Sequence, residues 1–113
     1  MSFRLTPTRL AAIYSCLRAM PPFCRWKLPP ADQITFKAVK RHDVYGEHDM
    51  TPNIIRVSTS LNGHWDTICK TLAHEMVHEA QRVAGEPRTH GEGGFMRRWR
   101  LVARRFGWDP KAT

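Results

Sequence analysis

Residues 71–80 read TLAHEMVHEA, and this stretch decides the fold that the chain is expected to adopt. On an α-helix, side chains four residues apart project from the same face, so the imidazoles of His74 and His78 can converge on one Zn²⁺. Glu75 lies between them, where its carboxylate can lean over a position that the two histidines leave open. The pattern therefore predicts a zinc-binding helix that carries the general base of a hydrolytic site.

The residues around this motif recur at helical spacing. One stripe is apolar and is predicted to face the core: Ile68, Leu72, Met76, Ala80 and Val83. A second stripe beside it is polar: Thr67, Thr71, His74, His78 and Gln81. Both histidines then lie together at the edge of the core. A chance match of the pattern on a polar helix face would not require this placement, so we interpret the motif as a metal site.

A third zinc ligand has to come from elsewhere in the chain, and His90, Glu86, Glu92 and more distant acids are the candidates. From the second histidine of the motif, the helix would carry the chain about 9 Å onward to Ala84. Residues 85–89 can span about 16 Å if they are extended, which is enough to return to the metal. The side chain of His90 is therefore within reach.

Signals for the end of the zinc helix support this path. Gly85 is well placed as the C-cap, and Pro87 prevents the helix from continuing. Residues 89–92 resemble a capping box, which would put His90 at the first position of the next helix. The remaining histidines are expected on the surface or in loops and not as ligands, although His64 precedes the zinc helix and could approach the cleft: His42, His48 and His64.

From Asn53 to Trp99 the chain resembles the SprT-like zinc metalloproteases, the family of Spartan-like protease domains. The matching features are a β-branched segment that ends in residues 58–61, the motif at residues 71–80, and a His-Gly pair at residues 90–91 that leads to Phe95. The family pattern is His-Gly-x-x-Phe, whereas Phe95 follows one residue later here, and residues 1–113 lack the C-terminal zinc ribbon of many relatives. The resemblance implies Zn²⁺ as cofactor, Glu75 as catalytic residue and three zinc ligands: His74, His78 and His90.

The rest of the sequence predicts a compact α+β domain over residues 1–113, with its motif region at residues 53–106, and the resemblance implies that this domain is zincin-like. Thr6 and Pro7 suit the start of an N-terminal helix. Short strands are expected at residues 34–39, 44–49 and 53–58, in a small, largely antiparallel sheet. In the architecture that the resemblance implies, such a sheet backs the active-site helix and its edge strand can pair with an extended substrate backbone.

The last predicted helix, about residues 92–106, is amphipathic and basic. Its apolar residues share one face that should pack on the zinc helix: Phe95, Trp99, Val102 and Phe106. Its arginines are predicted to occupy the opposite face: Arg97, Arg98, Arg100, Arg104 and Arg105. Such a face is commonly just solvated. A net charge of +8 and a pI near 10.1 make sequence-independent binding of nucleic acid an equal alternative.

Composition bounds the remaining possibilities. No apolar run approaches the ~20 residues needed to cross a bilayer, and Arg18 interrupts the apolar stretch that could resemble a secretory signal. Three cysteines without paired spacing indicate reduced thiols and a cytoplasmic location: Cys16, Cys24 and Cys69. The sequence does not specify an oligomeric state.

Together these patterns predict a zinc-dependent endopeptidase that acts on protein substrates, with proteins bound to DNA as candidates. The main alternative is a basic nucleic-acid-binding module in which zinc is structural and Glu75 has no catalytic part. A structural site is normally closed by a fourth protein ligand, and no further Cys or His is evidently placed for that role. A hydrolase acting on something other than peptides is the third possibility.

Overall fold

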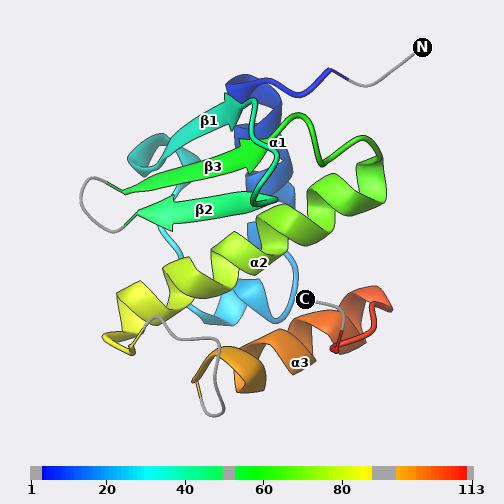
Figure 1. Cartoon of the computed structure of the whole chain (residues 1–113). Helices are drawn as coiled ribbons and strands as arrows, with labels where there is room; N and C mark the ends of the chain where they lie inside the picture. Colours follow the sequence, from blue (N-terminus) through cyan, green and yellow to red (C-terminus); the bar gives the residue numbers. More distant parts are fainter. Residues whose placement is uncertain (1–3, 50–52, 88–93, 112–113) are drawn as a thin grey trace.

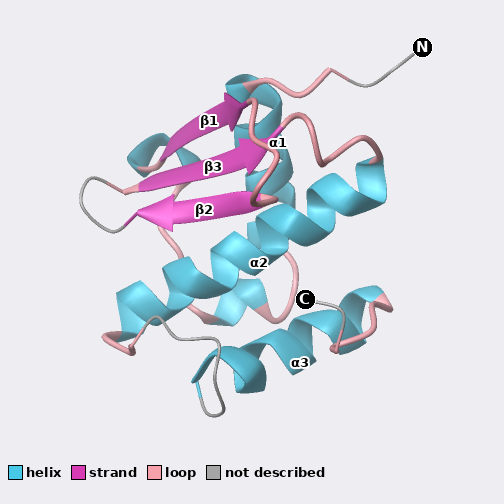
Figure 2. Cartoon of the chain, in the orientation of Figure 1, coloured by secondary structure: helices cyan, strands magenta, loops and turns pink. Residues whose placement is uncertain are grey.

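Helix α2 (Trp65–Ala84) lies between a three-stranded sheet and helix α3 (Gly94–Phe106), as Figure 1 shows. The computed structural model describes residues 4–49, 53–87 and 94–111. Helix α1 (Pro7–Arg18) also packs against the sheet and α2. Two 3₁₀ turns, Phe23–Arg25 and Ala31–Gln33, connect α1 to the sheet. Helices and strands share one core, which confirms the predicted α+β class (Figure 2).

The sheet is mixed, with strand order β1-β3-β2. Strand β1 (Thr35–Val39) pairs in parallel with β3 (Ile54–Ser58), while β2 (Gly46–Asp49) pairs antiparallel with β3. The prediction of a largely antiparallel sheet is therefore wrong, since the described strands form one parallel and one antiparallel pairing. The strand richest in apolar β-branched residues, β3, takes the central position, where four of its five side chains are buried.

The start of α1 and the end of α2 agree with the capping residues that the sequence predicts. Thr6 caps α1 by accepting a hydrogen bond from the backbone N–H of Arg9 at 3.2 Å, and Pro7 opens the helix. Gly85 ends α2 in the left-handed conformation, with φ of 73°, which glycine adopts without a steric penalty. Both predicted helix boundaries are confirmed. No helix in the described parts of the chain is both long and apolar enough to cross a membrane.

Helix α2 is buried from Thr71 to Gln81 except at His74, which is half-buried. The apolar stripe faces the core as predicted, except that Val83 is 37% exposed near the end of the helix. Most of the polar stripe is covered as well, because β2 lies on one side of it and α3 on the other. A helix covered in this way must find partners for its polar side chains inside the protein.

Glu79 is one of these polar side chains and is fully buried. Its carboxylate accepts hydrogen bonds from Arg82 at 2.7 and 2.8 Å, from His48 at 2.8 Å and from Asn53 at 2.8 Å. His48 is only 3% exposed, so its predicted surface position is wrong. These contacts join β2 and the start of β3 to α2.

Burial alone would raise the pKa of Glu79, but the hydrogen bonds from Arg82, His48 and Asn53 outweigh it and lower the pKa to about 2. Because the folded-state pKa lies below the ordinary value of 4.5, ionised Glu79 stabilises the fold above about pH 4.5. This contribution is lost as the pH falls from that value through about 2.

We expect Glu79→Gln to lower the free energy of unfolding at pH 7 by about 2–4 kcal/mol, since the amide cannot satisfy three charge-assisted donors. Denaturant titrations should also show a weaker loss of stability between about pH 5 and 2 in this variant than in the wild type. Glu47→Gln is the matched control, because Glu47 pairs with Arg41 at the surface and should contribute about 0–1 kcal/mol. Equal effects of the two substitutions would contradict a stabilising role for the Glu79 contacts.

Candidate metal and catalytic site

His74 and His78 project from the same face of α2. Their ring centres lie 5.2 Å apart with an interplanar angle of 67°. Two imidazoles bound to one tetrahedral Zn²⁺ at about 2.0–2.1 Å would place their ring centres roughly 5 Å apart. Phe95 of α3 contacts both rings, at 4.8 and 4.9 Å between centres. The donor type and spacing of this pair therefore fit a zinc ion.

The third predicted ligand, His90, lies outside the described residues, as does the alternative Glu92. Within residues 4–49, 53–87 and 94–111, no group of three His, Cys, Asp or Glu side chains is arranged to hold a metal. The other alternative, Glu86, binds Arg98 through both carboxylate oxygens at 2.8 and 3.1 Å and contacts Arg97 at 3.2 Å. The hydrogen bonds from Arg98 hold the pKa of Glu86 below its usual range, so its charge is already compensated.

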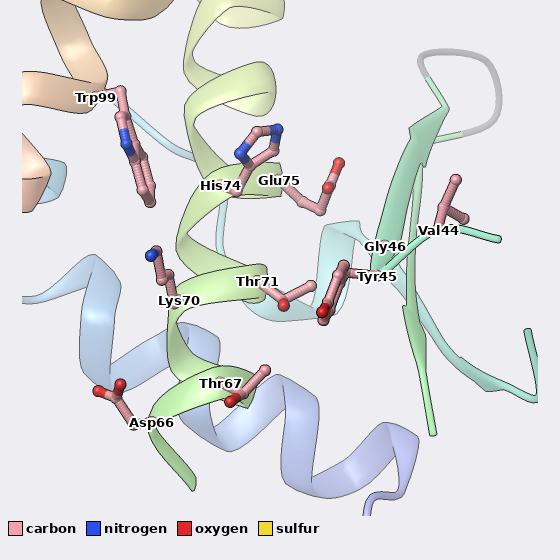
Figure 3. Close-up of a pocket in the computed structure, with 10 residues that line it drawn as sticks. All are labelled: Val44, Tyr45, Gly46, Asp66, Thr67, Lys70, Thr71, His74, Glu75 and Trp99. Atoms are coloured by element: carbon pink, nitrogen blue, oxygen red, sulfur yellow. The ribbon is translucent and has the colours of Figure 1, made fainter. Parts of the chain in front are cut away.

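Glu75 is 5% exposed and turns toward β2, next to His74 (Figure 3). Gly46, the first residue of β2, faces it closely. A Cβ atom at this position would lie 3.3 Å from Oε2 of Glu75, 3.0 Å from Cγ2 of Thr71 and 2.9 Å from the carbonyl oxygen of Arg56. The shortest of these contacts is with the backbone of β3, so a side chain at Gly46 would disturb the pairing of β2 with β3 as well as the approach of β2 to α2.

A cleft of about 720 Å³ runs over this face of α2. Figure 3 shows Trp99 on one side of the helix and residues 44–46 on the other, with His74 and Glu75 between them. The remaining wall comes from the first half of α2, including Lys70. A histidine, a carboxylate, an ammonium group and an aromatic ring thus border one open groove.

Asn62 fixes the side of the cleft that β2 forms. Its amide nitrogen donates to the carbonyl of Ser58 at 2.7 Å and to the carbonyl of Tyr45 at 3.1 Å. Its side-chain oxygen accepts a hydrogen bond from the hydroxyl of Thr71 at 2.6 Å. Asn62 therefore ties the start of β2 to α2, one turn before Glu75.

The arginines of α3 do not form one solvent-facing group. Arg98 is 7% exposed, pairs with Glu86 and stacks over Trp26 at 4.9 Å, so its predicted place on the solvated face is wrong. Its partners lie far away in sequence, and they provide charge compensation that helical spacing cannot reveal. Arg97 is exposed but also forms an ion pair with Glu86, the partner of Arg98. The remaining three are exposed and form no ion pair within the described residues: Arg100, Arg104 and Arg105.

The sequence indicates no role for Gly46, for Asn62 or for Gln81, the hydrogen-bond partner of His78. Glycine is disfavoured in strands, although a glycine in a strand can also signal close approach of another element. Asn62 comes after β3 without any motif. His78 contacts Gln81 within α2, with 3.0 Å between Nδ1 and Oε1, a contact that the i, i+3 spacing permits but does not specify.

Compared with known proteins, the chain matches no family model, no curated protein and no solved structure.

We expect Gly46→Ala to reduce the free energy of unfolding by about 1–3 kcal/mol, because β2 must shift away from the carbonyl of Arg56 and from the side chains of Thr71 and Glu75 to accept the methyl group. The matched control is Gly63→Ala, since a Cβ at Gly63 meets nothing within 4 Å. Denaturant unfolding of both variants measures the difference. A Gly46→Ala variant as stable as the Gly63→Ala variant would show that the contacts of β2 at Gly46 are not tight.

Proposed function

We propose that this protein is a zinc-dependent endopeptidase, with His74, His78 and His90 as zinc ligands and Glu75 as general base. The observation that carries the proposal is the pair of imidazoles 5.2 Å apart beside a buried carboxylate at the edge of an open cleft. The assignment of His90 as the third ligand rests on its position in the sequence. The proposed zincin-like architecture, with the motif on the helix next to the sheet, agrees with the position of α2.

Bound Zn²⁺ would supply a Lewis acid and bring the pKa of a water molecule down to about 7. Within this mechanism, Glu75 accepts the proton of the attacking water at a carboxylate oxygen and later donates it to the leaving amine. Gly46 lies close to this carboxylate, and Glu75 is only 5% exposed, so β2 limits the space in which the carboxylate can move. Phe95 packs against both histidine rings and limits their rotation.

The shape of the site supports a peptide as substrate. Among the described residues, strand β2 pairs only with β3, so its other edge can form hydrogen bonds with an extended backbone. This edge borders the cleft through Gly46 and the exposed Tyr45. An extended chain laid along it would pass in front of Glu75. This placement favours a protein or peptide over a small, compact substrate.

The alternative of a structural zinc in a nucleic-acid-binding module explains less of the site. A structural zinc would require a fourth protein ligand and would gain nothing from a carboxylate beside it. Glu75 follows His74 on α2, and both residues line the cleft. A hydrolase for substrates other than peptides would use the same chemistry, and a peptide-cleavage assay separates it from the endopeptidase.

Nucleic acid is the second partner that we propose, together with a cytoplasmic location and action on proteins bound to DNA. The supporting observation is the outward face of α3, where Arg100, Arg104 and Arg105 have no acidic partner within the described residues. Phosphates of any sequence would suit these guanidinium groups.

We expect Glu75→Gln to retain zinc and fold while losing peptidase activity by about 10²–10⁴-fold, because the general base is removed and the metal ligands remain. Metal analysis and cleavage of casein, measured on the same samples, test this. Asp32→Asn is the control for the same chemical change at an exposed position. His74→Ala should lose zinc as well as activity. Cleavage by a folded, zinc-loaded Glu75→Gln variant would contradict the mechanism.

We expect the triple change of Arg100, Arg104 and Arg105 to Gln to weaken binding to duplex DNA and to flatten its salt dependence. Each lost phosphate contact should change the slope of log affinity against log salt by about 0.9. Fluorescence anisotropy over a salt series measures this, with Lys27, Lys37 and Lys40 changed to Gln as a charge-matched control. Identical slopes for the two triple variants would exclude the α3 face as the binding surface.

A further inference from the structure

Gln81 occupies a fully buried position one turn after His78 on α2. Its side chain makes two hydrogen bonds. The amide nitrogen lies 2.9 Å from the carbonyl oxygen of Pro87, and the amide oxygen lies 3.0 Å from Nδ1 of His78. Neither the SprT-like resemblance nor the helical pattern assigns any role to this residue.

The directions of the two bonds are set by their chemistry. A backbone carbonyl can only accept a hydrogen bond, so the NH₂ group of Gln81 must face Pro87. The oxygen of Gln81 must then face His78, and it too can only accept. Nδ1 of His78 therefore carries the proton and donates it, which leaves the ring lone pair on Nε2.

We propose that Gln81 is the positioning residue of the metal site: it holds the proton of His78 on Nδ1 and so presents Nε2 as the nitrogen that binds the metal. Histidines that bind metals in proteins commonly have their other nitrogen fixed by a hydrogen-bond acceptor in this way. The proposal rests on the proposed zinc site and adds the residue that selects the tautomer and orientation of one ligand.

The same side chain also joins α2 to the start of α3. Pro87 and Gly94 are the described residues on either side of residues 88–93, and both lie against Gln81. A Cβ at Gly94 would lie 3.3 Å from the amide nitrogen of Gln81 and 2.8 Å from Oε1 of Glu86. The amide of Gln81 thus packs against the start of α3 while its oxygen holds His78.

Two substitutions separate these roles. Gln81→Met keeps the length of the side chain and removes both hydrogen bonds. Gln81→Glu keeps an acceptor for His78 but, when ionised, cannot donate to Pro87. Gln33→Met applies the first change at an exposed glutamine and serves as control.

Competition with a chromophoric chelator would measure zinc affinity of the full chain. We expect Gln81→Met to weaken binding by about 10–100-fold relative to the wild type and Gln33→Met, which should agree with each other. Gln81→Glu should bind zinc nearly as well as the wild type, although it should be less stable to denaturant because the bond to Pro87 is lost. Unchanged zinc affinity in Gln81→Met would overturn the inference and leave the zinc site standing.

A measurement without any substitution gives an independent test. In the zinc-loaded wild type, long-range ¹H–¹⁵N correlations of the His78 ring should show a proton on Nδ1 and zinc on Nε2. Zinc on Nδ1 would overturn the inference even if Gln81→Met fails to fold. A wild type that binds no zinc would overturn the proposed function first, and the role of Gln81 with it.

Discussion

The fold is constrained above all by the burial of polar side chains on α2. Between Thr71 and Gln81 this helix buries a hydroxyl, two carboxylates, an imidazole and an amide among its apolar residues. A buried polar group without a partner costs more than a satisfied one contributes, so each must find a partner nearby. Glu79 binds His48 and Asn53 of the sheet region, Thr71 binds Asn62, and Gln81 binds the chain beyond the helix. The neighbours of α2 are thereby fixed in place by specific bonds as well as by apolar contact.

Local sequence predicts those parts of the molecule in which the deciding interactions are local. The cap at Thr6, the stop at Gly85 and the apolar stripe of α2 each depend on residues within a turn or two. The structure confirms both helix ends and, apart from Val83, the stripe. The parallel pairing of β1 with β3 depends instead on β3 entering between two earlier strands. Strand periodicity has the same form for either direction of pairing, so it could not predict this outcome.

The candidate site divides in the same way. The spacing of His74 and His78 places both rings on one face whatever surrounds the helix, and the structure agrees. The burial of His48 could not be predicted, since it depends on Glu79, which is 31 positions away. The burial of Arg98 depends in the same way on Glu86 and Trp26, which are 12 and 72 positions away. A charged or polar side chain is buried where a distant partner compensates it. Helical or strand periodicity, which assigns such residues to the surface, misses them.

Gly46 connects the proposed chemistry to the proposed binding of substrate. A single Cβ at Gly46 would touch Arg56 of β3 together with Thr71 and Glu75 of α2, so β2 packs closely against both elements. Asn62 donates a hydrogen bond to the carbonyl of Tyr45, just before β2, and accepts one from Thr71 of α2. The strand therefore cannot slide along the helix without breaking one of these two hydrogen bonds. In the proposed mechanism, a peptide on the edge of β2 and the carboxylate of Glu75 therefore share one rigid support. Such a site would gain its rate from positions set before binding, since catalytic groups held in the productive geometry need no rearrangement during the reaction.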